Sequence, residues 1–145
     1  MRLALAAFAA LTLLMESAWS AGALPHIPKD APYTEVVRRM RAAGFRPQPI
    51  LKRPDDVIAS CDYNLSKSCK RRPEVLMCAA DGPCLYLFVR VSDGAPVLVG
   101  AYGDSEDTGA YPSYMGMRWP DASDWRDLDR LVIAGPKSHL RRPKP

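Results

Sequence analysis

Four cysteines lie within a short stretch of this 145-residue chain, at Cys61, Cys69, Cys78 and Cys84. Thiolates that hold zinc usually stand about two to four residues apart and are completed by further Cys or His ligands. Here the gaps are longer and both histidines lie far away, so the spacing predicts disulfides and no metal site. The Cys-x-x-Cys motif of a thioredoxin-like redox site is also missing from the sequence.

Four cysteines allow three disulfide pairings. Cys78 and Cys84 flank a segment that contains the strong turn signal Asp81-Gly82-Pro83. Two strands that meet at this turn would bring both thiols within disulfide distance. We therefore favour Cys78–Cys84 together with Cys61–Cys69. Each bond closes a short loop and is expected to stabilise the fold by about 2–3 kcal/mol.

Two groups of carboxylates are candidates for calcium binding or for acid–base hydrolysis. A loop that begins at Asp104 starts like a calcium-binding loop, but its twelfth position is Met115, where a bidentate glutamate is needed. Hydrolysis by a carboxylate pair needs a defined spacing and a member with a raised pKa, and nothing in the sequence indicates the necessary burial. A small carboxylate-dependent hydrolase is therefore the alternative function, with the candidates Asp104, Glu106, Asp107, Asp121 and Asp124.

Both histidines lie near the chain ends, His26 in a proline-rich segment and His139 in a basic tail. A general base has to be held firmly beside its nucleophile, so neither histidine suits a Ser/His or Cys/His enzyme. The sequence also lacks a Gly-rich phosphate loop and a His-Glu-x-x-His zinc helix. We therefore predict no enzyme activity, no catalytic residue and no cofactor.

Residues 111–119 combine aromatic, methionine and arginine side chains in a segment broken by Gly and Pro. This composition is typical of a contact surface. It predicts that Tyr111, Tyr114, Arg118 and Trp119 bind a protein or glycan partner in the cell envelope. The alternative is that about half of these side chains cap the hydrophobic core, because a small domain needs its aromatic residues inside.

Charge is distributed unevenly along the chain. It carries 20 Lys and Arg against 16 Asp and Glu, a net charge of +4. Residues 33–72 hold ten basic and four acidic side chains, and residues 136–145 hold four basic ones. This pattern indicates contact with an anionic surface through the basic tail, although a solvated surface is the simpler interpretation. No nucleic-acid-binding motif is present, so a nucleic acid partner is not expected.

The first 23 residues follow the order of a secretory signal peptide. Arg2 supplies the positive start, residues 3–15 form an apolar run, and small residues follow from Ser17 onward. A run of 13 residues is too short for a bilayer core, which needs about 20. We predict cleavage before Ala21 or before Leu24 and a periplasmic or secreted protein without a transmembrane segment.

Periodicity and turn signals indicate the elements that position these residues. Val36, Val37 and Met40 form one apolar helix face over 32–43, and Gly44 is a natural stop. Residue types favour extended segments at 45–51, 74–78, 85–91, 97–102, 117–119 and 131–134, the last of which could also continue a helix. The remaining expectations are an extended leader at 24–32, a loop at 103–116, a second helix capped by Asp121 or Ser123, and a disordered basic tail at 136–145.

These elements predict one α+β domain over 33–135. Its N-terminal helix is expected to pack on a small antiparallel meander of strands that disulfides stabilise. The function we expect is that of a non-catalytic interaction module in the envelope or outside the cell. A narrower version is an inhibitor of a secreted hydrolase, in which the acidic loop would meet a basic active site.

The chain also resembles a scattered group of small, uncharacterised secreted or periplasmic bacterial proteins. Those proteins carry a helix that ends in Ala-Gly-Trp/Phe-x-Pro, as at residues 43–47, and a Pro-Glu-x-x-x-Cys…Gly…Cys segment before a hydrophobic hairpin, as at residues 73–84. The resemblance covers about residues 33–102, and the chain departs from it from Gly103 onward. The group has no established activity, so the resemblance implies no function and no site residue.

Overall fold

The structure is a computed structural model that describes residues 23–54, 72–78, 83–102, 114–135 and 140–142. Several predictions lie outside the described residues: residues 1–22 of the signal peptide, the Cys61–Cys69 bond, and the side chains of Asp104, Glu106, Asp107 and Tyr111. Within the described ranges the chain forms two helices and seven strands, and every strand pair is antiparallel. The described part of the chain is therefore α+β, as the sequence predicts.

Helix α1 (Tyr33–Ala42) begins after Pro32 and ends before Gly44. Proline fixes φ near the value that helix entry needs, and Gly44 takes φ 81°, a left-handed conformation that glycine adopts without strain. Val36 and Met40 lie one helical turn apart and are completely buried. The apolar spacing in the sequence therefore marks the helix face that enters the core.

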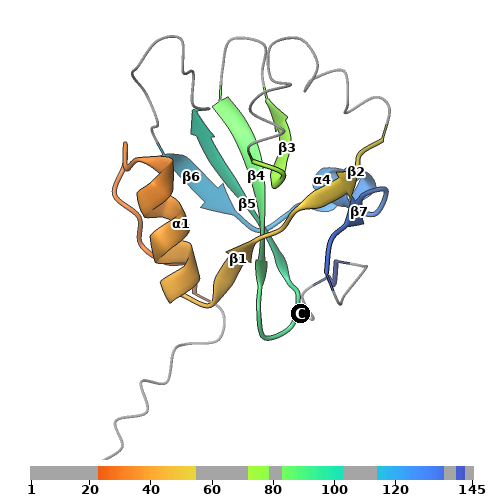
Figure 1. Cartoon of the computed structure of the whole chain (residues 1–145), viewed down its shortest axis with the longest axis horizontal. Helices are drawn as coiled ribbons and strands as arrows, with labels where there is room; N and C mark the ends of the chain where they lie inside the picture. The colour runs from red at the N-terminus through yellow and green to blue at the C-terminus, as the bar shows by residue number, and fades with distance from the viewer. Residues whose placement is uncertain (1–22, 55–71, 79–82, 103–113, 136–139, 143–145) are drawn as a thin grey trace, which may run out of the picture.

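A five-stranded antiparallel sheet forms the centre of the molecule (Figure 1). Three of its strands form a meander: β4 (Pro83–Arg90), β5 (Pro96–Tyr102) and β6 (Tyr114–Arg118). Asp93 holds the β4–β5 turn, because its carboxylate accepts hydrogen bonds from the Arg90 side chain and from the N–H of Ala95. The loop predicted at 103–116 is wrong at its end, since residues 114–116 already belong to β6.

Two short strands share the other edge of β4. β1 (Phe45–Pro47) pairs with the end of β4, and β3 (Val75–Cys78) pairs with its beginning. Leu87 lies at the junction, where its N–H donates to the Glu74 carbonyl oxygen and its own carbonyl oxygen accepts from the N–H of Gln48, both at 2.9 Å. The backbone of β4 thus stays hydrogen-bonded across the gap between two strands that are distant in the sequence.

A second, two-stranded sheet consists of β2 (Ile50–Lys52) and β7 (Val132–Ile133), and helix α4 (Ala122–Leu128) precedes β7. The extended segment predicted at 45–51 is divided, because the chain leaves the first sheet after β1 and enters the second at β2. The buried Gln48 side chain lies at this crossing and donates to the carbonyl oxygen of Ala134. The preference for a strand within 131–134 is confirmed.

Hydrophobic side chains pack on both faces of the five-stranded sheet. Residues of α1 cover one face, where they meet Tyr86, Phe88 and Val97. Residues of α4 and of the second sheet cover part of the other face, where they meet Leu87 and Leu98. Figure 1 shows α1 and the pair of α4 and β7 on opposite sides of the sheet. The alternation of side chains along β4 and β5 explains this division.

The disulfide favoured from the sequence, Cys78–Cys84, is present and joins β3 to β4. The two cysteines are direct partners in the strand register, with Cα atoms 3.9 Å apart. The pairing of β3 with β4 therefore brings the thiols together, while residues 79–82 of the expected turn lie outside the described residues. Among the described residues, no helix is long and apolar enough to cross a membrane.

Candidate functional site

Three of the four predicted contact residues are described, and they do not form one patch. Tyr114 begins β6 and Trp119 follows it, and both are partly buried against the core face that α1 covers. Arg118 is exposed on the opposite side of the sheet. Neighbouring residues of a strand point to opposite faces, so the sheet itself separates Arg118 from Trp119.

Trp119 and Tyr114 hold the edge of the core. The ring centroid of Trp119 lies 6.2 Å from that of Phe45, and the Arg90 guanidinium lies 5.2 Å from the Trp119 centroid. The Tyr114 N–H donates to the Ala31 carbonyl oxygen at 3.1 Å, and burial raises the pKa of the Tyr114 phenol. The contacts of Tyr114 and Trp119 are thus those of side chains that cap the hydrophobic core, the alternative considered for this segment.

Arg118 is held by the first turn of α4. Its guanidinium donates two hydrogen bonds to the Asp124 carboxylate and lies 3.5 Å from that of Asp121. Asp121 is the N-cap of α4, as predicted, and accepts from the N–H groups of Ser123 and Asp124. The Ser123 hydroxyl, followed by these backbone donors, lowers the pKa of Asp121 to about 2.

The two described members of the carboxylate set therefore have structural partners. Hydrolysis by paired carboxylates needs one member with a raised pKa, whereas the pKa of Asp121 is lowered. Asp124 accepts from the Asp121 N–H at 2.8 Å and completes a capping box. The other three candidates, Asp104, Glu106 and Asp107, lie outside the described residues. In the part of the chain that the structure describes, no group of three or more His, Cys, Asp or Glu side chains could hold a metal ion.

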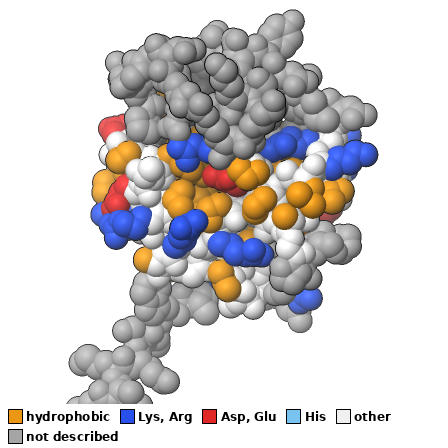
Figure 2. Space-filling model, viewed as in Figure 1, with side chains coloured by type: hydrophobic (Ala, Val, Ile, Leu, Met, Phe, Trp, Pro, Cys, Tyr) orange, Lys and Arg blue, Asp and Glu red, His pale blue; other side chains and the backbone are white. Residues whose placement is uncertain are grey.

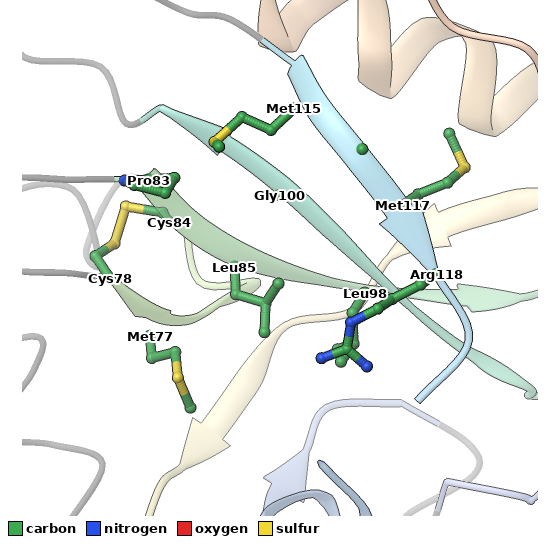
Figure 3. A pocket seen from close by; sticks show the side chains of 11 residues that line it. Met77, Cys78, Pro83, Cys84, Leu85, Leu98, Gly100, Met115, Met117 and Arg118 are labelled. Atoms are coloured by element: carbon green, nitrogen blue, oxygen red, sulfur yellow. A yellow bond between two sulfur atoms is a disulfide. The ribbon is translucent and has the colours of Figure 1, made fainter. Parts of the chain in front are cut away.

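A groove that the sequence analysis missed lies beside Arg118 (Figure 3). Its volume is about 560 Å³, and it lies on the sheet face that α4 and the second sheet cover only in part. Its lining comes from the four strands β3 to β6 and is mostly apolar. We define the methionine groove as the surface formed by Met77, Leu85, Leu98, Gly100 and Met115.

A pair of glycines makes this part of the sheet hollow. Gly100 of β5 is the register partner of Gly116 of β6, so two neighbouring positions carry no side chain. A Cβ atom on Gly100 would stand 3.8 Å from the Met115 Cβ and from the Gly116 carbonyl oxygen, which is ordinary van der Waals contact. A side chain at position 100 would therefore not clash with the neighbouring backbone. A larger side chain at Gly100 would fill the groove instead.

The groove offers thioether and aliphatic groups, with the Cys78–Cys84 disulfide at one end and Arg118 at its rim. In Figure 3 the side chain of Met117 points away from the other lining residues, toward the helix. Methionine is flexible and polarisable, so it adapts to apolar groups of different shape. Arg118 already forms an ion pair with Asp124, so a ligand of the groove does not need a negative charge to balance it. This surface suits the binding of an apolar group.

The outer edge of β6 borders the groove. β6 is the last strand of its sheet, and its first residue is hydrogen-bonded to the backbone of Asp30 and Ala31. From Met115 to Arg118 the described residues provide backbone partners from β5 alone. With respect to the described residues, the outward backbone groups of this stretch are open to a further strand.

A second polar cluster lies in the core. The Tyr33 hydroxyl donates to the Glu74 carboxylate at 2.9 Å, and both side chains are buried. The Arg72 guanidinium lies 4.3 Å from the centroid of the Tyr33 ring. Burial, and then the charge of Glu74, raises the pKa of Tyr33 far above its usual value. This hydrogen bond connects α1 to the start of β3, and its two residues are 41 positions apart in the sequence. Local sequence spacing therefore could not predict the contact.

In three comparisons, no protein-family model, no curated protein and no solved structure matches this chain. The resemblance to small secreted bacterial proteins therefore stays a prediction. The sequence signal that could have located the groove is Gly100, because a glycine inside a strand often marks the close approach of another backbone or a ligand.

Proposed function

We propose that this protein is an exported, non-catalytic interaction module that binds an apolar, extended segment of a protein partner in the methionine groove. The observation that carries the proposal is the apolar groove of about 560 Å³ beside the outer edge of β6. A peptide that adds to a sheet edge gains affinity from backbone hydrogen bonds and specificity from alternate side chains that enter pockets. The edge of β6 and the methionine groove supply these two features side by side.

The methionines support a partner with aliphatic or aromatic side chains rather than a polar one. Met77 is half-buried and Met115 is exposed, so both side chains retain freedom to adjust to a ligand. Burying one aliphatic side chain of the partner between them is worth about 1.5–3 kcal/mol. The neutralised Arg118 at the rim then provides hydrogen-bond donors and contact area.

Export is supported by two features that are independent of the groove. The order of charge, apolar run and small residues in the first 23 positions is that of a secretory leader. The Cys78–Cys84 bond is compatible with an oxidising compartment, where disulfides persist. A periplasmic or extracellular location follows as part of the proposal.

The test uses a displayed library of random octapeptides that is selected on the wild-type protein. The selected peptides are then measured against Gly100→Val, in which a β-branched side chain occupies the groove without backbone strain. We expect the affinity to fall about tenfold to hundredfold, which corresponds to one excluded aliphatic side chain. Leu51→Ser is the matched control, because Leu51 is an exposed apolar residue outside the groove.

Two outcomes would refute the proposal. One is a selection that yields no peptide above background. The other is a set of peptides that bind Gly100→Val as tightly as wild type, since such peptides would use another surface. The melting temperature and the Cys78–Cys84 bond of each variant are measured first, so that loss of binding is not confused with loss of fold.

A further inference from the structure

The β2–β7 ribbon carries two exposed apolar residues, one on each strand. Ile50 and Ile133 are register partners and are buried, each with 5% of its surface exposed. The register shifts between Ile50 and Lys52, so Leu51 lies at this irregularity and Val132 is the register partner of Lys52. Leu51 and Val132 are exposed, with 68% and 47% of their surface accessible. We define the apolar pair as Leu51 and Val132. Exposed aliphatic side chains gain free energy when a contact removes them from water.

Three cations flank the apolar pair. Lys52 is exposed at the end of β2, and neither Lys52 nor Arg46 has a carboxylate partner among the described residues. The Arg46 guanidinium lies beside Gly135, just beyond the other end of the ribbon, 3.5 Å from the place a Cβ would occupy there. Arg53 donates hydrogen bonds to the carbonyl oxygens of residues 73 and 75, and it has no carboxylate partner within the described ranges.

The carboxylates nearest to β7 in the chain are already paired. Asp127 lies 3.8 Å from the guanidinium of Arg130, and Asp129 lies 3.1 Å from that of Arg142. Arg142 also stands 5.0 Å above the ring of Trp125. This tail arginine therefore contacts its own domain.

We infer that the β2–β7 ribbon docks on an anionic phospholipid surface, with Leu51 and Val132 at the headgroup boundary and Arg46, Lys52 and Arg53 against the headgroups. A membrane surface accepts aliphatic side chains between cations, and each cation near it adds to the attraction. Figure 2 shows Lys and Arg side chains spread across the face that includes α1, β1 and β2, with hydrophobic side chains and some acidic ones between them. The inference goes beyond the peptide-binding proposal and does not depend on it.

The experiment is vesicle co-sedimentation with protein recovered from a periplasmic fraction, whose N-terminus is checked by mass spectrometry. Vesicles of phosphatidylglycerol mixed with phosphatidylethanolamine are compared with vesicles of phosphatidylcholine. We expect binding to the anionic vesicles and none to phosphatidylcholine. Raising the salt from about 0.15 M to about 1 M shortens the Debye length from about 8 Å to about 3 Å and should release the protein.

Two pairs of variants locate the contact. Lys52→Ala should weaken binding to anionic vesicles about fivefold, the share of one surface cation. Its control is Arg41→Ala, which removes an exposed cation of α1 outside the ribbon. Leu51→Ser should also weaken binding, and its control is Val91→Ser, because Val91 is 61% exposed in the β4–β5 turn.

Equal losses in Lys52→Ala and Arg41→Ala would overturn the inference, because the contact would then reflect net charge alone. Binding that survives about 1 M salt, or equal binding to phosphatidylcholine, would overturn it as well. Gly100→Val leaves the ribbon intact and should bind vesicles like wild type. The peptide-binding proposal and the membrane inference can therefore fail separately.

Discussion

The buried hydrogen bond between Tyr33 and Glu74 is expected to contribute strongly to stability. Tyr33→Phe removes the hydroxyl that donates to the Glu74 carboxylate at 2.9 Å and leaves the ring in place. Tyr33 is 1% exposed and Glu74 is 8% exposed, so water cannot replace the lost donor without a rearrangement. Hydrogen bonds to charged groups contribute about 1.5–3 kcal/mol, so we expect the free energy of unfolding to fall by about 2 kcal/mol.

The assay is urea unfolding at neutral pH under oxidising conditions. For a protein of this size, a loss of about 2 kcal/mol lowers the urea midpoint by about 1 M. A double-mutant cycle with Glu74→Gln separates the pairwise energy from the effect of each single change. We expect a coupling of about 1.5 kcal/mol or more, because each single variant leaves the other partner without its charge-assisted bond.

Tyr102→Phe is the matched control, since Tyr102 is 38% exposed at the end of β5. Its effect should stay within about 0.5 kcal/mol, as for most surface substitutions. If Tyr33→Phe costs no more than Tyr102→Phe, the bond contributes nothing net. In that case burial and charge do not make this hydrogen bond stabilising, even if both variants remain folded.

Two further predictions concern pH and Trp119. The pKa values of Glu35 and Asp121 are both lowered to about 2 in the folded protein. For Glu35 the cause is the hydrogen bonds from Arg38 and then from Arg39. The stability that the two carboxylates confer should therefore be present above their ordinary pKa near 4 and be lost as the pH falls toward 2. Urea midpoints between about pH 6 and pH 2 should therefore fall less steeply in a combined Glu35→Gln and Asp121→Asn variant, and an identical slope would contradict this. Trp119→Ala should lower the free energy of unfolding by about 2 kcal/mol, because the Trp119 ring packs beside Phe45. The loss should be smaller than for a fully buried Trp, since Trp119 is only partly buried. Unchanged stability would mean that Trp119 is a contact residue and does not support the core.

The features that the sequence could predict depend on residues close together in the chain. The α1 helix follows from the spacing of Val36 and Met40 and from the stop at Gly44. The cap of α4 follows from Asp121, which lies three residues before Asp124 and forms the capping box with it. The Cys78–Cys84 bond follows from a turn signal within the loop that it closes.

The strand order could not be predicted in the same way. β1 and β3 share one edge of β4, and Leu87 bonds to Gln48 on one side of the junction and to Glu74 on the other. A strand pattern with a period of two shows that a segment is extended but does not show which edge it joins. The passage of the chain from the first sheet to the second depends on the contact of Gln48 with Ala134, 86 positions away.

The face on which Tyr114 lies depends on an irregularity in β6. The register between β5 and β6 shifts between Gly100 and Ala101, so one extra residue of β6 lies opposite this step. Without the shift, strict alternation would place Tyr114 on the same face as Arg118. With it, Tyr114 enters the core face and Met115 lines the methionine groove.

The composition of residues 111–119 therefore indicated a surface segment without indicating its faces. Aromatic and methionine side chains are suited both to a core edge and to a binding surface, and residue type alone does not separate the two. Strand alternation separates Arg118 from Trp119, and the register shift in β6 brings Tyr114 to the core face. The glycine pair of Gly100 and Gly116 leaves space on the other face. The methionine groove thus results from backbone geometry and from missing side chains, which a search for reactive residues passes over.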